Sequence, residues 1–204
     1  PANWIENDSD VFHDSCGTSV GGRSPKYTQY LKERNALELE DHGAMREFGK
    51  RGNQTVEGRP STISYRDGQE GWSVTELLAY IDACTSDDHP FFLHLSLPKP
   101  HQCYTPAQEF WDLYDSDKLT MPPNSGYDMS LQAPHVQAAA RFWQSGDWTL
   151  FEPHTFEAGR RRKLHGYLGN LSHIDHAIGE VLDHLRQTGL DKNTIVVYSS
   201  DHGD

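Results

Sequence analysis

A helical repeat followed at once by a short apolar run occurs twice in this sequence, and that order leaves few folds open. In the second occurrence, residues 161–188 hold apolar side chains at a period of about 3.6 residues over several turns, which predicts a helix. Gly189 follows where a helix C′ residue is expected. After a short turn, the β-branched run TIVVYS at residues 194–199 predicts a strand.

The first occurrence lies earlier in the chain. Ser73 is expected to be the N-cap of a helix, because Glu76 follows as its capping-box partner and apolar residues then recur at helical spacing. Residues 91–97 (FFLHLSL) predict a strand, which Pro98 and Pro100 end. Helices that alternate with strands indicate a parallel sheet covered by helices. The sequence therefore predicts an α/β fold with a mostly parallel sheet and long loops.

Residues 1–72 form a polar, loop-rich region before this predicted α/β portion. One helix is expected in it, from Pro25 or Tyr27 to about Glu40, because aromatic and leucine side chains fall on one side. The run GTSVGG lacks the Lys-Ser/Thr ending of a phosphate-binding loop, so a flexible turn is expected there.

The α/β portion itself covers residues 73–204 and contains a long insertion at residues 98–160. Two short helical patches are expected in the insertion, at residues 107–114 and 133–142. Two of its tryptophans are expected to anchor the loop by packing, with pocket lining as the alternative: Trp143 and Trp148.

Composition indicates whether the chain is a whole domain and which kinds of partner it can bind. Only 35% of the 204 residues are hydrophobic, and the mean hydropathy is −0.74, which is low for an α/β domain with strands buried on both faces. Either loops dominate, or part of the core lies outside these residues. Because the chain opens on Pro1 without an initiator Met and stops at Asp204 within an expected loop, we expect residues 1–204 to be a partial domain, truncated at both ends. The formal charge of 18 − 30 = −12 disfavours nucleic acid as a partner. No apolar run reaches membrane-spanning length, and the sequence favours no compartment.

The cysteines and the helical histidines form no familiar ligand pattern. Cys16, Cys84 and Cys103 lack CxxC spacing and are odd in number, so reduced thiols are expected rather than a disulfide framework. The histidines of the 161–188 helix lack an HExxH arrangement. Solvent-facing or capping positions are therefore expected for His165, His173, His176 and His184.

Polar residues follow both predicted strands, at the sheet edge where ligands of parallel sheets gather. Asp201 and His202 offer an oxygen and a nitrogen that could form half of a divalent-cation site, although such a pair is more often part of a turn or cap. Lys99 and His101 are two positions apart, so in an extended segment their side chains point the same way and could face one sulfate or phosphate group. In the alternative interpretation, the Lys99 side chain lies in solvent and His101 forms a hydrogen bond with a nearby carbonyl.

Two segments resemble the sulfatase family, of the alkaline phosphatase-like superfamily. Residues 89–124 (HPFFLHLSLPKPHQCYTPAQEFWDLYDSDKLTMPPN) are similar to the sulfatase segment that carries an active-site histidine. Residues 166–204 (GYLGNLSHIDHAIGEVLDHLRQTGLDKNTIVVYSSDHGD) are similar to the helix, strand and metal-binding turn of the same family. The two matches occur in the family's order and at roughly its spacing, whereas residues 1–72 and 125–160 match only loosely.

The resemblance assigns expected roles residue by residue. Asp201 and His202 would be ligands of a divalent cation, usually Ca²⁺ in this family, with Mn²⁺ or Mg²⁺ as alternatives. His101 would contact the sulfate ester near its leaving-group oxygen, and Lys99 would bind substrate beside it. The cation would clamp the sulfate while basic residues offset developing charge.

The chain also departs from the family. Sulfatases attack with a formylglycine made from Cys or Ser in a C/S-x-P-x-R signature, and no cysteine or serine here stands in that signature. The family's paired N-terminal aspartates and its downstream lysine are also missing, so the formylglycine is expected in an upstream segment. The resemblance implies that the full-length protein hydrolyses a small-molecule or carbohydrate sulfate ester. A phosphonate monoester or phosphodiester hydrolase and a noncatalytic binding module are the alternatives.

Overall fold

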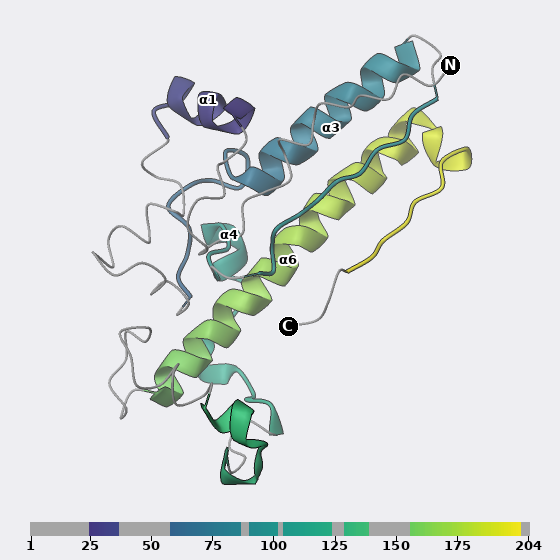
Figure 1. Cartoon of the computed structure of the whole chain (residues 1–204). Helices are drawn as coiled ribbons and strands as arrows, with labels where there is room; N and C mark the ends of the chain where they lie inside the picture. Colours follow the sequence, from purple (N-terminus) through teal and green to yellow (C-terminus); the bar gives the residue numbers. More distant parts are fainter. Residues whose placement is uncertain are drawn as a thin grey trace.

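The computed structural model describes residues 25–36, 58–86, 90–101, 104–123, 129–138 and 156–200. Two long helices, α3 (Gln69–Ser86) and α6 (Phe156–Thr188), lie side by side and run in the same direction (Figure 1). Around them lie α1 (Pro25–Glu33), α4 (Gln108–Trp111) and the 3-10 helices η2 (Ser116–Lys118), η4 (Met129–Leu131) and η6 (Leu190–Lys192). None of the helices within these ranges is long and apolar enough to cross a membrane.

Helix α6 confirms the helix that the apolar period predicts, and it begins five residues earlier than residue 161. Gly189 follows it with φ +74°, so the predicted C′ position is also confirmed. The backbone of residues 104–106 crosses α6 so closely that a Cβ atom on Gly166 would lie 2.5 Å from the Tyr104 carbonyl oxygen. The absence of a side chain at this position of α6 therefore allows the segment after His101 to lie directly on the helix.

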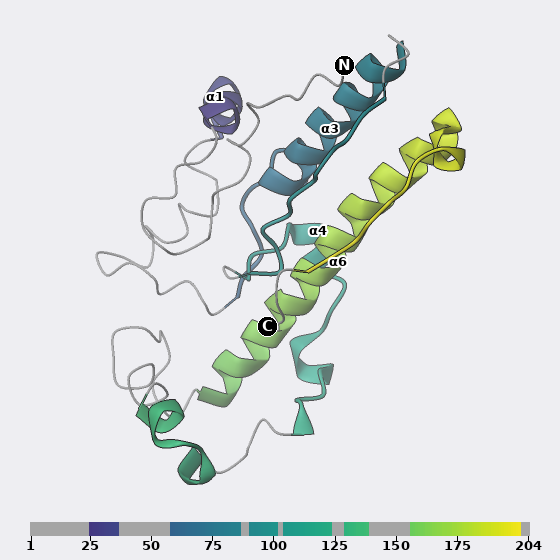
Figure 2. The ribbon, with the colours of Figure 1, turned by 45° about the vertical axis from the view of Figure 1, so that its right-hand side comes forward.

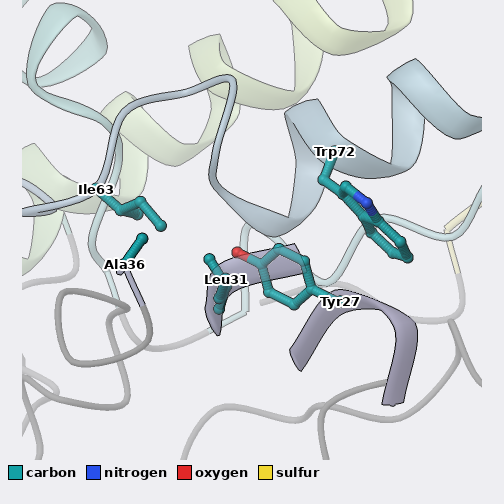
Figure 3. Packing of buried hydrophobic residues seen from close by; sticks show 5 residues of the cluster. All are labelled: Tyr27, Leu31, Ala36, Ile63 and Trp72. Atoms are coloured by element: carbon teal, nitrogen blue, oxygen red, sulfur yellow. The ribbon is translucent and has the colours of Figure 1, made fainter. Parts of the chain in front are cut away.

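A first apolar core joins α1 to the beginning of α3 (Figure 3). Tyr27 and Leu31 of α1 are fully buried against Trp72 and Ile63, as the one-sided pattern of this helix predicts. The Tyr27 hydroxyl donates a hydrogen bond to the Asp67 carbonyl at 2.8 Å, which satisfies the one polar atom of the ring. A second core lies between α3, α4 and α6 and consists of Tyr65, Val74, Ala107, Phe110 and Ala177.

Helix α1 ends at Glu33, so the predicted extension to about Glu40 is wrong. Asn35 adopts a left-handed conformation with φ +53°, and the Ala36 N–H donates to the Leu31 carbonyl at 2.8 Å. This 6→1 bond is a Schellman-type cap, which Asn permits because it tolerates the left-handed region.

Helix α3 begins at Gln69, so the prediction of Ser73 as N-cap and Glu76 as its capping-box partner is wrong. Ser73 is a buried residue inside the helix. The Trp72 N–H already donates to the Gly68 carbonyl at 2.9 Å, one turn before the predicted start. The sequence does not predict this first turn, because glycines at positions 68 and 71 lower the helix propensity of the segment.

The two predicted strands are extended segments, but the predicted parallel sheet is not confirmed. Residues 91–97 run back along α3, and residues 194–200 run back along α6, both in the same direction (Figures 1 and 2). No β-strand occurs in the described ranges. An apolar, β-branched run predicts extended backbone, but a strand also needs a hydrogen-bonded neighbour, which the local pattern does not specify.

The short helical patches of the insertion are found in part. The patch predicted at residues 107–114 is the single turn α4, and residues 134–138 are helical within the patch predicted at residues 133–142. The remainder of the second patch, Trp143 and Trp148 lie outside the described residues.

Candidate active site

His101 stands at the end of a tight turn that follows the first extended segment. Its N–H donates to the Pro98 carbonyl oxygen at 3.1 Å, and the Lys99–Pro100 peptide bond within the turn is cis. Asn170 of α6 is fully buried and donates from Nδ2 to the Pro100 carbonyl oxygen at 3.3 Å. The turn is therefore tied to α6 immediately before His101, and His101 itself is exposed.

Lys99 lies in the same turn, but its ammonium contacts a carboxylate of this chain. The Nζ atom lies 3.3 and 3.4 Å from the two carboxylate oxygens of Glu70, and the Lys99 side chain is only 13% exposed. The alternative that places Lys99 in solvent is therefore wrong. Its expected contact with substrate stays a prediction.

Glu70 is the site residue that sequence reasoning missed. It lies in the first turn of α3, is 2% exposed, and faces Lys99, which follows it by 29 residues. Burial alone would raise the pKa of Glu70, but the Lys99 ammonium and hydrogen bonds to the carboxylate outweigh burial and hold the pKa below its ordinary value. Its position near a helix N-terminus also favours negative charge. No local pattern identified Glu70, because its partners come from distant segments.

His173 of α6 completes this buried group. Its Nδ1 atom accepts the Ala107 N–H at 3.3 Å, so the ring proton resides on Nε2, which lies 3.7 Å from a Glu70 carboxylate oxygen. Burial lowers the pKa of His173 to about 4, against the opposing effect of Glu70. At neutral pH the group therefore consists of a charged pair, Glu70 and Lys99, beside a neutral imidazole.

Two of the helical histidines are buried, contrary to the expectation of solvent-facing or capping positions. His173 stacks on the Phe110 ring, with the ring centroids 4.7 Å apart. His165 lies flat on Trp111 with centroids 3.8 Å apart, and its Nε2 bonds to the Trp111 carbonyl oxygen at 2.8 Å. Both rings face α4 and the chain around it, which an apolar-only period could not reveal. His176 is exposed, and His184 bonds to Asp82 of α3 at 2.8 Å.

The predicted metal ligands Asp201 and His202 lie outside the described residues, as do Cys16 and Cys103. Cys84 is a free, half-buried thiol. Within the described ranges, no three histidine, cysteine, aspartate or glutamate side chains converge as a metal site. The described part of the site is therefore the His101 turn with its anchors on α3 and α6.

Comparison with known proteins defines the class to which this arrangement belongs. The sequence matches the sulfatase family profile over residues 2–204. The chain therefore belongs to the sulfatase family, as the resemblance of its two segments implies.

Individual relatives agree with this membership. A choline-sulfatase from Rhizobium meliloti is 33% identical over 115 residues, which is 56% of this chain and 22% of the relative. An ulvan-active sulfatase from Formosa agariphila is 31% identical over 132 residues, or 64% of this chain and 20% of the relative. A multifunctional alkaline phosphatase superfamily protein, PehA, from Trinickia caryophylli is 25% identical over 199 residues, or 91% of this chain and 38% of the relative. The chain thus spans between a fifth and two fifths of the length of these relatives.

Proposed function

We propose that the full-length protein is a sulfuric ester hydrolase that cleaves a small-molecule or carbohydrate sulfate ester. The observation that carries this proposal is the sulfatase match over residues 2–204. The relatives named choline-sulfatase and ulvan-active sulfatase support it. The formal net charge of −12 disfavours a nucleic acid as substrate, because like charges repel.

His101 is the residue that we propose to act on the ester. An imidazole can donate a hydrogen bond or a proton near neutral pH, which suits the oxygen of a departing alcohol. His101 is exposed at the end of a turn that α6 anchors, so a substrate can reach it. Lys99 would contribute positive charge beside it, and its ammonium already lies near the buried carboxylate of Glu70.

Asp201 and His202 are proposed to hold a divalent cation, with Ca²⁺ favoured and Mn²⁺ or Mg²⁺ as alternatives. The donor set fits such an ion in part, because a carboxylate suits all three metals and an imidazole favours the more borderline Mn²⁺. When bound, the cation would polarise the sulfate oxygens. Two ligands do not fill a coordination sphere, so further ligands would come from other residues of the full-length protein.

The architecture around these residues is also part of the proposal. Residues 91–97 and 194–199 would be parallel strands of an alkaline phosphatase-like sheet, which would bring His101 and Asp201 to one edge. The nucleophile would be a formylglycine from an upstream segment, because no cysteine or serine of this chain stands in a C/S-x-P-x-R signature.

Purified full-length protein, assayed with matched 4-nitrophenyl esters of sulfate and of a phosphonate, tests the activity. We expect hydrolysis of the sulfate ester, a loss of more than about tenfold in kcat for His101→Ala, and no turnover by residues 1–204 alone. Faster hydrolysis of the phosphonate would favour the second candidate, a phosphonate monoester or phosphodiester hydrolase. The observation that keeps a second activity open is the similarity, over 91% of the chain, to a relative named as a multifunctional alkaline phosphatase superfamily protein. No turnover of either ester would favour a noncatalytic binding module.

A further inference from the structure

Glu70 is a buried carboxylate for which the proposed chemistry provides no use. A carboxylate is buried this completely only where partners offset the loss of its hydration. Its charged partner is the Lys99 ammonium at 3.3 Å, and the neutral His173 ring lies 3.7 Å away, so its two neighbours come from different parts of the chain. Both of these side chains are themselves largely buried. The pair is therefore shielded from solvent and ions, which makes it stronger than an exposed ion pair.

The contacts of this group converge on the turn that carries His101. Lys99 joins the turn to α3 through Glu70, and Pro100 joins it to α6 through the Asn170 side chain. The His101 N–H closes the turn on the Pro98 carbonyl oxygen. Each of the two residues that precede His101 therefore contacts a different helix. Together these contacts restrict the position of the His101 backbone.

We propose that Glu70 is a positioning residue, which acts through Lys99 to hold the His101 imidazole at the leaving-group oxygen of the sulfate ester. The proposal rests on the proposed function, and Glu70 itself touches no substrate. A proton donor must lie within hydrogen-bond reach of the departing oxygen, so a small displacement of His101 weakens proton transfer while sulfate binding persists. The effect is largest for leaving groups that depart poorly without a proton.

Two aryl sulfates of different leaving ability test this in the full-length protein. For Glu70→Gln we expect kcat with phenyl sulfate to fall by a factor on the order of 10 to 100, kcat with 4-nitrophenyl sulfate to fall less, and KM to change little. Glu76→Gln is the matched control, because Glu76 is exposed on the same helix, and its kinetics should equal those of the unmodified protein. The double variant Glu70→Gln/Lys99→Met leaves no buried charge unpaired, and it should keep the selective loss with phenyl sulfate.

Several outcomes would overturn the proposal. If Glu70→Gln lowers kcat equally with both substrates, or does not lower it, Glu70 does not position His101 for proton transfer. A raised KM for both substrates in Lys99→Met alone, with normal kinetics in Glu70→Gln, would show that Lys99 binds the sulfate directly. If Glu70→Gln does not fold, the double variant decides by the same comparison of substrates.

Nuclear magnetic resonance separates a failure of this proposal from a failure of the proposed function. If the unmodified protein hydrolyses no sulfate ester, the function is wrong, and the His101 imidazole signals still report its environment. A changed His101 signal in Glu70→Gln, against an unchanged one in Glu76→Gln, supports positioning. An unchanged His101 signal in both variants rejects it.

Discussion

Burial and neighbouring charges together set the charge of the side chains beside the His101 turn. Lys99 keeps Glu70 ionised although the carboxylate is removed from water, whereas burial keeps His173 neutral although a carboxylate lies near it. His173 fits this position as a neutral ring, because its Nδ1 accepts the Ala107 N–H and its Nε2 lies 3.7 Å from a Glu70 carboxylate oxygen. A neutral ring therefore fills a position where a second cation would be poorly hydrated.

The depressed pKa of His173 makes stability depend on pH. The imidazole titrates near 6.5 in the unfolded chain and at about 4 in the folded protein, so the unfolded chain binds more protons as the pH falls between these values. The free energy of unfolding should therefore decrease as the pH falls from 7 to 4, with about 3 kcal/mol of the decrease due to this residue. Urea unfolding of the full-length protein across this range measures it. His173→Gln, whose amide can accept the same N–H, should show a shallower pH dependence, and parallel curves would contradict the assignment.

Asp201 carries the second test of single residues. If it ligates the cation, Asp201→Ala should weaken binding of Ca²⁺ or Mn²⁺ to the full-length protein by at least about tenfold, which is 1.4 kcal/mol. Asp183→Ala provides the control, because Asp183 is an exposed residue of α6 that pairs with Arg186. Calorimetric titration measures both. Equally tight binding in all three proteins would place the cation elsewhere.

Among the elements, α6 is the one that local pattern could specify almost completely. Its apolar period continues over many turns and Gly189 ends it, so both signals agree. The ends of α1 and α3 were mispredicted because single residues decide them: Asn35 adopts the left-handed cap, and Gly68 and Gly71 occupy the start of α3. The group around Glu70 could not be predicted at all, since it joins residues from three segments far apart in the sequence.

Close packing on α6 gives a prediction with a control on the same helix. In Gly166→Ala the new Cβ would lie 2.5 Å from the Tyr104 carbonyl oxygen, so backbone must shift, and we expect a loss of about 1 to 3 kcal/mol in unfolding free energy. In Gly179→Ala the Cβ meets nothing within 4 Å, and alanine's higher helix propensity should add up to about 1 kcal/mol. Denaturant unfolding of both variants measures the difference. Shifts of the same sign would contradict the close approach at Gly166.

Considered as a whole, the described part of the molecule leaves apolar surface on both sides of its last extended segment. Ile195 and Val197 are 92% and 83% exposed, and Val196 and Tyr198, which alternate with them, are also exposed. Successive side chains of an extended segment point to opposite faces, so both faces of residues 194–199 are apolar. A segment that is apolar on both faces is typical of a central strand of a parallel sheet, covered on each side. Phe92, in residues 91–97, is similarly exposed.

Hydrogen exchange in the full-length protein tests whether these segments are strands. Amides of residues 91–97 and 194–199 that bond to neighbouring strands open only when the sheet opens, so they should exchange more slowly than free amides by a factor on the order of 10³ or more. Amides in the middle of α6 provide an internal standard for slow exchange, because their hydrogen bonds lie within the helix itself. Pairing on both sides would protect consecutive amides, whereas pairing at one edge would protect every second amide. Rapid exchange throughout both segments, with α6 still protected, would show that they are extended without being part of a sheet, and the proposed edge joining His101 to Asp201 would then be lost.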